Sequence, residues 1–367
     1  QILIGADYYE RHPYVERATL TNVTFKAINP RSKGDKTDMK ICVFGAGAVG
    51  GILAGRLLKS GTNISIIARG AHLAAIQEKG LTVRDREGDW VVPATATDDT
   101  SSIGVQDLLI IGLKAHTVTA ALNQMKPLIG PKTAVMHIVN GIPWWFFHGL
   151  DGKQPANHLE CVDPGGRILT SFGPEKALGC VVHIASNVPE PGIVEHNAGG
   201  TFFIGEPDNS ESERLSIIVD ALGESGLRMR PTNDIRSEVW GKLWANITGN
   251  PVSVLLEARF GDMFGEPAVR DLMRNIIKEA ASVARAYGSK ADVDIETRLD
   301  GLASLGKAKT STLQDFEAGK SLEVDALVGS VTELARLADI ETPIIDLVYA
   351  LTRQKAKVAG LYSPPSS

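Results

Sequence analysis

The sequence has few cysteines and no long apolar run. Its three cysteines are Cys42, Cys161 and Cys180. This odd, unpatterned set excludes a disulfide framework and favours a reducing compartment, so we expect a cytoplasmic protein. No C-x-x-C pair marks a zinc site. The longest apolar stretch, at 108–113, is far shorter than the roughly 18 residues of a membrane span, so the sequence predicts no membrane segment.

An excess of charge of one sign is also missing. The 367 residues include 38 basic and 43 acidic ones, for a net charge of −5, and 43% are apolar. These proportions are those of a globular protein and exclude a disordered chain or a collagen. A mildly acidic chain is a poor candidate for broad electrostatic binding to nucleic acid or to an anionic membrane. The histidines lack the spacing of metal ligands, so we predict no metal site. We expect the partner of this chain to be a small molecule.

The two ends differ from the rest of the chain. Residues 1–38 lack the apolar core of a secretory signal and finish in a polar stretch, so we interpret them as an extension outside the fold. Residues 363–367 read Ser-Pro-Pro-Ser-Ser and predict a frayed tail. The length between these ends is sufficient for two domains.

The hydrophobic pattern changes once along the chain. In the first part, strand-like apolar runs alternate with helical segments, which is typical of βαβ units and a parallel sheet. The predicted strands are 40–44, 63–68, 107–113 and 133–139, and the predicted helices are 49–58, 71–79 and 117–127. Further strands, partly antiparallel, are expected between 169 and 203. Beyond residue 233, helical segments dominate, at 237–256, 268–287, 311–318 and 323–338. The sequence thus predicts an α/β Rossmann-type dinucleotide-binding domain at 39–233 followed by an all-α C-terminal domain at 234–362.

Glycine is abundant, and its densest cluster directly follows the first predicted strand. The cluster fits G-x-G-x-x-G and consists of Gly45, Ala46, Gly47, Ala48, Val49 and Gly50. In this fingerprint Gly45 makes a tight turn, Gly47 lets the backbone approach a pyrophosphate, and Gly50 lets helix and strand pack closely. The following helix N-terminus offers free N–H groups to the phosphates. The alternative is a plain glycine-rich turn, but the strand and helix around the cluster favour dinucleotide binding.

The residues after the second predicted strand indicate which dinucleotide binds. An NAD site places an Asp or Glu there to hold the ribose 2′-hydroxyl, whereas this chain has Arg69 and no carboxylate. A guanidinium pairs with a 2′-phosphate through charge-assisted hydrogen bonds. Lys114, just past the 107–113 strand, is placed to help. We therefore predict NADPH as the cofactor, with two ordinary solvated charges as the alternative.

Four sequence blocks resemble the ketopantoate reductase (2-dehydropantoate 2-reductase) family. They are the glycine cluster with its strand, Lys114-Ala115, Asn140-Gly141-Ile142, and a set comprising K-L-x-x-N-x-x-x-N-P at 242–251, S-x-L-Q-D at 311–315 and L-E-V-D at 322–325. The resemblance extends from 39 to about 351, and the last set is its most specific part. It implies Lys242 as the general acid and admits a homodimer. The implied substrate contacts are Asn140 (which also lies near the nicotinamide), Asn246, Asn250, Ser311 and Glu323.

The spacing of three of these residues has a physical meaning. Lys242, Asn246 and Asn250 are four residues apart, so on a helix they share one face. Pro251 cannot donate to the carbonyl four residues earlier, which predicts a kink or break near Asn250. Plainer interpretations stay open. They are a solvated lysine, asparagines that cap a kink, Ser311 as the cap of the 311–318 helix, and Glu323 as the residue that opens its own helix.

The stretch after Asn140 departs from the family pattern, because 143–147 reads Pro-Trp-Trp-Phe-Phe. These aromatic side chains either pack beneath an active-site loop or form an apolar wall for a bulkier substrate. We expect NADPH-dependent reduction of a 2-oxo acid to a 2-hydroxy acid, with ketopantoate to pantoate as the favoured reaction. The alternatives are the same chemistry on another 2-oxo acid, and a non-catalytic NADPH-binding sensor.

Overall fold

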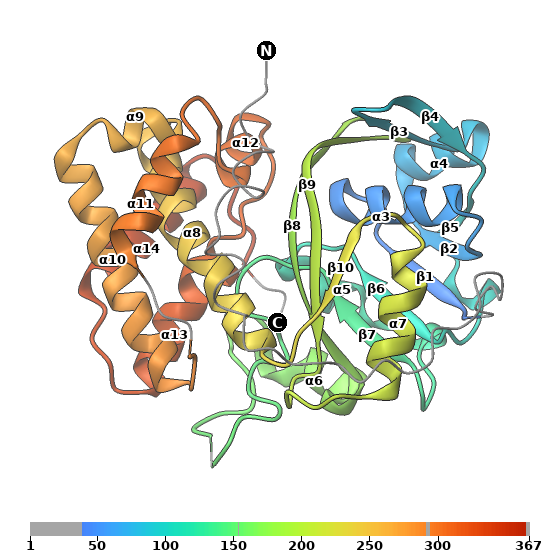
Figure 1. Ribbon diagram of the computed structural model, residues 1–367, viewed down its shortest axis with the longest axis horizontal. Helices are drawn as coiled ribbons and strands as arrows, with labels where there is room; N and C mark the ends of the chain where they lie inside the picture. Colours follow the sequence, from blue (N-terminus) through green and yellow to red (C-terminus); the bar gives the residue numbers. More distant parts are fainter. Residues whose placement is uncertain (1–38, 153, 291–293, 365–367) are drawn as a thin grey trace.

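A computed structural model describes residues 39–152, 154–290 and 294–364 (Figure 1). The predicted extension at 1–38 and the last three residues of the predicted tail lie outside the described residues. Within the described part of the chain, a sheet-containing half precedes a helical half, and the two lie side by side with α8 (Ile235–Leu256) between them (Figure 1). The predicted fold class, a Rossmann-type α/β half followed by an all-helical half, is confirmed.

The first half is built on a ten-stranded mixed sheet with the order β4-β3-β9-β8-β7-β6-β1-β2-β5, and β10 pairs with β9. Its strands are β1 (Ile41–Phe44), β2 (Ile64–Ile67), β3 (Leu81–Asp85), β4 (Gly88–Val92), β5 (Thr95–Thr97), β6 (Leu108–Ile111), β7 (Ala134–His137), β8 (Ala177–Glu190), β9 (Ile193–Gly205) and β10 (Arg228–Pro231). Strand β1 pairs in parallel with both β2 and β6. The long strands β8 and β9 form the antiparallel pair expected after residue 169.

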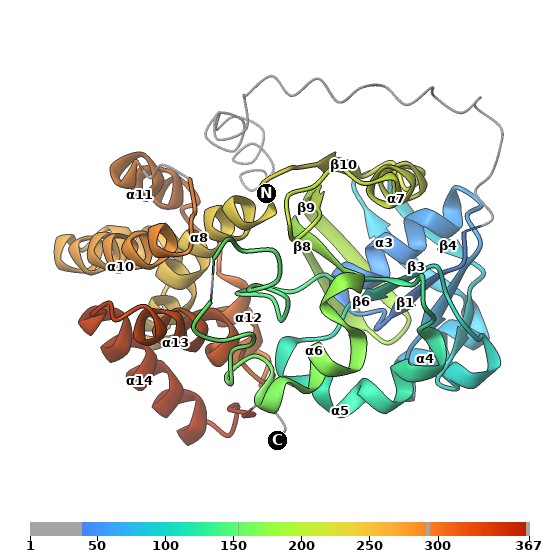
Figure 2. The ribbon, with the colours of Figure 1, turned by 90° about the horizontal axis from the view of Figure 1, so that it is seen from below.

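Helices cover both faces of this sheet. They are α3 (Ala48–Lys59), α4 (Gly70–Lys79), α5 (Ala115–Met125), α6 (Arg167–Phe172) and α7 (Glu213–Gly223). Figure 2 shows α3 and α7 on one side of the sheet and α5 and α6 on the other. Strand β1 therefore contributes to two apolar cores, Ile41 and Val43 to one and Cys42 and Phe44 to the other. Burial on both faces explains its unbroken apolar sequence.

The second half consists of packed helices. Its helices are α8, α9 (Phe260–Phe264), α10 (Pro267–Ala286), α11 (Ile295–Ser304), α12 (Ser311–Glu317), α13 (Ser330–Leu337) and α14 (Pro343–Val358), with a π-helical turn η5 (Asp325–Gly329) before α13. Of the kink or break predicted near Asn250, the break is wrong, because α8 continues through Pro251 to Leu256. Every residue from Ile247 to Val254 is buried, so packing outweighs the cost of about 3 kcal/mol that a proline imposes on a helix interior. The first residues of the segment expected to be strand-like, 169–172, belong instead to the helix α6.

The aromatic stretch 144–147 joins the two halves. All four side chains are buried, and none is more than 6% exposed. The ring of Phe146 lies edge-on to Trp240, with centroids 6.2 Å apart, and to Tyr287, at 5.7 Å. Arg236 of α8 donates to the carbonyls of Phe146, His148 and Pro207. The packing interpretation is therefore confirmed, and these rings leave almost no surface for a substrate wall.

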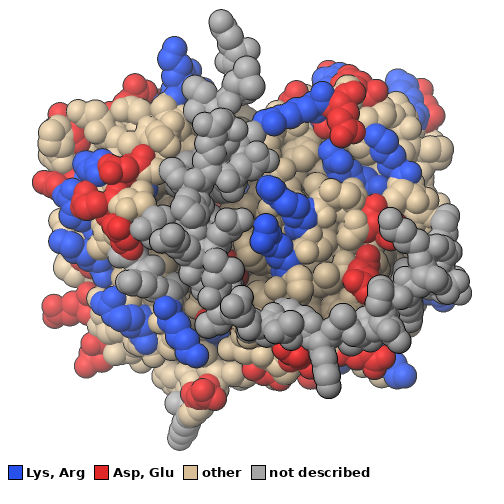
Figure 3. Space-filling view, viewed as in Figure 1, with Lys and Arg blue, Asp and Glu red and all other residues tan. Residues whose placement is uncertain are grey.

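The distribution of charged side chains and the state of the cysteines agree with the low net charge and the few cysteines of the sequence. Basic and acidic side chains are interspersed over the helical half on the face drawn in Figure 3. In the part of the chain that the structure describes, no helix is both long and apolar enough to traverse a bilayer. The three cysteines are unpaired thiols, of which Cys42 and Cys180 are buried.

Candidate active site

The glycine-rich turn connects β1 to α3 and needs its glycines for different reasons. Gly45 has φ +102°, a left-handed conformation that disfavours a side chain. A Cβ on Gly50 would lie 2.4 Å from the Gly45 carbonyl oxygen, so this position must be glycine for helix and strand to pack. A Cβ on Gly47 would meet no protein atom closer than 3.9 Å, so the space beside it is open. No side chain caps α3 at Gly47, which leaves its first N–H groups available to an anion.

His72, which the sequence did not single out, holds this turn in place. Its Nδ1 accepts a hydrogen bond from the backbone N–H of Gly192 at 2.9 Å. Nε2 therefore carries the proton and donates to the Ala46 carbonyl at 2.8 Å. Only the position of His72 on α4, beside the turn, identifies this role, because no motif contains it.

The two predicted phosphate-binding cations have different surroundings. Arg69 is exposed and directly precedes α4, two residues after Ile67, whose carbonyl accepts from the N–H of Gly45 at 2.9 Å. Lys114 precedes α5, and its ammonium donates to the Asp315 carboxylate at 2.9 Å and to the Ser321 carbonyl at 2.7 Å. Lys114 thus connects the sheet half to the helical half.

A polar network across the two halves contains three of the predicted site residues. Lys242 on α8 donates from Nζ to Asn140 Oδ1 at 2.8 Å. The other end of the Asn140 amide is then a donor, and this side chain also hydrogen-bonds Glu323. Glu323 Oε1 accepts from the N–H of Ala115 at 3.3 Å. Asn140 therefore bridges a cation and an anion that come from separate segments of the helical half.

Burial shifts the pKa values of the two ionisable groups in this network, Lys242 and Glu323. Desolvation lowers the pKa of Lys242 to about 8, against an opposing contribution from the Cys180 thiol and the Glu323 carboxylate. Desolvation likewise raises the pKa of Glu323, while the Lys114 charge and the hydrogen bonds from Ala115 and Asn140 act in the other direction. An ammonium whose pKa is close to neutrality is suited to donate a proton at physiological pH.

The remaining predicted residues lie along α8 and at the start of α12. Asn246 is one turn beyond Lys242, and both residues line a pocket that is described below. Asn250 is 4% exposed, and its Nδ2 has no hydrogen-bond partner within the described protein. Ser311 is exposed and is the first residue of α12. The capping alternative for Ser311 is wrong, because Thr310 caps α12 by accepting from the N–H of Leu313 at 3.0 Å.

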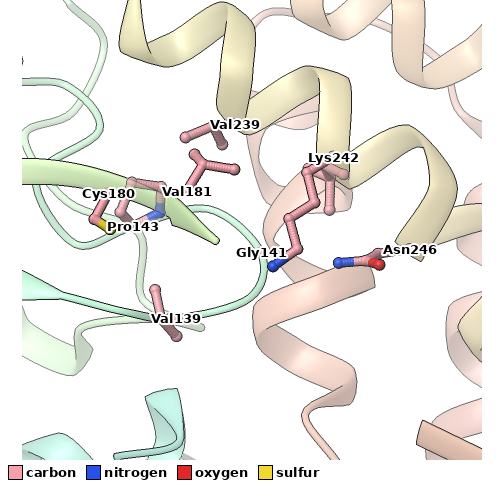
Figure 4. Close-up of a pocket in the computed structure, with 9 residues that line it drawn as sticks. Val139, Gly141, Pro143, Cys180, Val181, Val239, Lys242 and Asn246 are labelled. Atoms are coloured by element: carbon pink, nitrogen blue, oxygen red, sulfur yellow. The ribbon is translucent and has the colours of Figure 1, made fainter. Parts of the chain in front are cut away.

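A small pocket opens beside Lys242, between the 139–143 loop, β8 and α8 (Figure 4). In Figure 4 the Lys242 side chain extends from α8 toward Gly141, with Asn246 beside it. The other lining residues are Val139, Pro143, Cys180, Val181, Val239 and Leu243. The pocket therefore combines one cation and one amide with an apolar wall. No group of three or more metal-binding side chains occurs among the described residues.

Comparisons with known proteins cover both halves of the chain. A family model described as ketopantoate reductase PanE/ApbA matches residues 41–209, and the model of its C-terminal part matches residues 234–356. A 2-dehydropantoate 2-reductase of Mesorhizobium japonicum is 42% identical over 326 residues, which cover 89% of this chain and all of the relative. One from Pyrococcus horikoshii is 28% identical, over 88% of this chain and 99% of the relative.

Solved structures show the same fold. A Ralstonia solanacearum protein, provisionally assigned as a ketopantoate reductase, superposes with a TM-score of 0.84 at 38% identity. The match covers 88% of this chain and 99% of that protein. A D-mandelate dehydrogenase solved with NADH and anilino(oxo)acetate shares the fold, with a TM-score of 0.73 at 20% identity over 88% of this chain and all of that protein.

Proposed function

Because the chain belongs to the ketopantoate reductase family and is an oxidoreductase, we propose that it reduces 2-dehydropantoate (ketopantoate) to pantoate with NADPH. The observation that carries the proposal is the hydrogen-bonded network of Lys242, Asn140 and Glu323 beside the pocket. Burial lowers the pKa of Lys242 to about 8, and this supports a role for its ammonium as a proton donor.

The sheet half has the features that a dinucleotide requires. The uncapped N-terminus of α3 and the open side of Gly47 fit a pyrophosphate. The exposed guanidinium of Arg69 fits a 2′-phosphate, which favours NADPH over NADH. When bound, NADPH supplies a hydride to the keto carbon of the substrate.

Lys242 provides the proton that completes the reduction. As the keto carbon accepts a hydride, negative charge develops on the carbonyl oxygen, and the ammonium stabilises this charge and donates its proton there. General acid catalysis of this kind contributes about 10²–10⁴-fold to the rate. Asn140 holds Nζ in place, and the Glu323 carboxylate favours its charged form.

The other predicted site residues account for the remaining polar groups of the substrate in this proposal. We assign Asn246 and Ser311 to the carboxylate, and Asn250 and Glu323 to the hydroxyl group of ketopantoate. The unpartnered Nδ2 of buried Asn250 supports this assignment, because a buried donor without an acceptor costs about 1–3 kcal/mol. A substrate oxygen that accepts from Nδ2 would remove that cost.

The test is NADPH oxidation, followed by absorbance, with a panel of 2-oxo acids that differ in size and in the presence of a hydroxyl group. We expect ketopantoate to have the highest kcat/KM. Lys242→Ala is expected to keep NADPH binding and to lose about 10²–10⁴-fold in kcat. The matched control is Lys309→Ala, which removes a lysine paired with Glu317 on the surface. A better substrate of another kind refutes the substrate assignment, and NADPH binding without turnover on any acid identifies a sensor instead.

A further inference from the structure

We infer that the segment after α14, centred on Tyr362, positions Glu323 for substrate binding. This inference rests on the proposed function, since it takes Glu323 as a group that touches the substrate. The segment is remote in sequence from every motif of the site, and no residue of it lines the pocket.

The first set of contacts fixes the chain directly before Glu323. The N–H of Leu322 donates to the Leu361 carbonyl at 2.9 Å, and Leu322 and Tyr362 form a parallel bridge. The hydroxyl of Ser321 lies 3.0 Å from that of Ser363. The two strand-like pieces therefore run side by side up to the residue that precedes Glu323.

The second set fixes the chain directly after Glu323. Asp325, which begins η5, is 7% exposed. Its carboxylate accepts from the hydroxyl of Tyr362 at 2.8 Å and from that of Tyr349 at 2.6 Å. Arg353 donates to the Tyr362 hydroxyl at 3.1 Å, and its guanidinium lies over the Tyr362 ring, 5.1 Å from the centroid. The Tyr362 hydroxyl thus accepts from one charged group and donates to another, which makes both hydrogen bonds strong.

Glu323 is therefore anchored by the same segment on both sides, while its own carboxylate is bound to Ala115 and Asn140. The turn η5 also carries this restraint to the Asn140 loop. The N–H of Ile142 donates to the Ala326 carbonyl at 3.3 Å. A Cβ on Gly141 would lie 2.0 Å from the same oxygen. A shift of η5 would move Glu323 and the loop that carries Asn140 together.

Tyr362 is accordingly a positioning residue, and Tyr362→Phe tests it by removing one hydroxyl group. We measure the Kd of ketopantoate for the enzyme–NADP⁺ complex by calorimetry, with kcat and the KM for NADPH from turnover. The variant is expected to bind ketopantoate about 3–10-fold more weakly, because only part of a strong hydrogen bond is transmitted to Glu323. The KM for NADPH is expected to stay within about twofold, since the Tyr362 hydroxyl bonds Asp325 and Arg353, and neither belongs to the glycine-rich turn.

Two further variants separate positioning from general stabilisation. Tyr287→Phe also removes a hydroxyl hydrogen bond in the helical half, to the Leu334 carbonyl at 3.0 Å. It is expected to lower the melting temperature without weakening ketopantoate binding. In a Glu323→Gln background, Tyr362→Phe is expected to have little additional effect on Kd, because the two residues act through one contact.

The outcomes distinguish the two proposals. A wild-type chain that neither binds nor reduces ketopantoate refutes the proposed function and this inference together. An active wild type with an unchanged Kd in Tyr362→Phe refutes this inference alone. So does a Tyr362→Phe effect that persists in full in the Glu323→Gln background.

Discussion

Raising the pH through the pKa of Lys242 is expected to have opposite effects on the two directions of the reaction. Burial lowers this pKa to about 8. Reduction of the keto group needs the protonated ammonium, so the rate of reduction is maximal at pH values below this pKa and falls above it. Oxidation of the hydroxy acid needs the neutral amine as a base, so its rate rises over the same range.

The size of the effect follows from the titration curve. With a pKa of about 8, the ammonium is about 91% protonated at pH 7 and about 9% at pH 9, so kcat/KM for reduction falls roughly tenfold between them. Lys242→Arg is expected to abolish this pH dependence, since a guanidinium stays charged throughout. Glu323→Gln is expected to move the fall to lower pH, because the carboxylate stabilises the ammonium.

The assay is kcat/KM for NADPH oxidation and, separately, for NADP⁺ reduction, measured across the same buffers. Glu238→Gln is the matched control, because Glu238 lies on the same helix and burial raises its pKa to about 7. Burial lowers the pKa of His183 to about 3 and raises the pKa of Cys180 to about 12, so neither group changes its charge in this range. A profile that stays flat for reduction, or that moves with Glu238→Gln rather than with the Lys242 variants, would refute the assignment of Lys242 as the proton donor.

Three further substitutions test other parts of the structure. Arg69→Asp is expected to lower the kcat/KM preference for NADPH over NADH by at least about tenfold, because it removes the cation for the 2′-phosphate; an unchanged ratio contradicts this assignment. Gly141→Ala is expected to cost at least about 2 kcal/mol in urea unfolding, through the positive φ and the clash with Ala326. Gly152→Ala, which has a positive φ of 75° but open space around it, should cost clearly less. Phe146→Ala is expected to destabilise the fold by about 3–5 kcal/mol, and a shifted substrate preference at unchanged stability would show instead that the ring faces the pocket.

The fold was predictable wherever local pattern and burial coincide. The strands β1, β2, β6 and β7 are short apolar runs next to helices with clear periodicity. The glycine fingerprint after β1 also indicated that they belong to a dinucleotide-binding domain. The strands β3, β4 and β5 were not predicted. Their buried residues alternate with partly or fully exposed ones or are few, so these strands lack an apolar run. The uninterrupted course of α8 through Pro251 likewise depends on tertiary packing, which overrides the local preference.

The site was only partly predictable from the sequence. The spacing of Lys242, Asn246 and Asn250 identifies a shared helix face, and the family resemblance adds Asn140 and Glu323. The sequence gives no sign that one amide connects Lys242 to Glu323, or that Lys114 is bound to Asp315, because these contacts join segments that only the fold brings together. The choice between Ser311 and Thr310 as the cap of α12 depends on a difference of one residue in the helix start, which a pattern does not resolve.

The aromatic residues between the halves bear on how the protein unfolds. One continuous apolar cluster includes Phe44 and Leu109 from the sheet, Trp145 and Phe146 from the connecting stretch, and Trp240 from α8. Although the sequence divides into a βαβ pattern and a helical pattern, removing either half would expose the side chains on which the other half packs. The two halves should therefore melt in a single cooperative transition, and an isolated half should behave as a partly collapsed chain rather than as a folded domain.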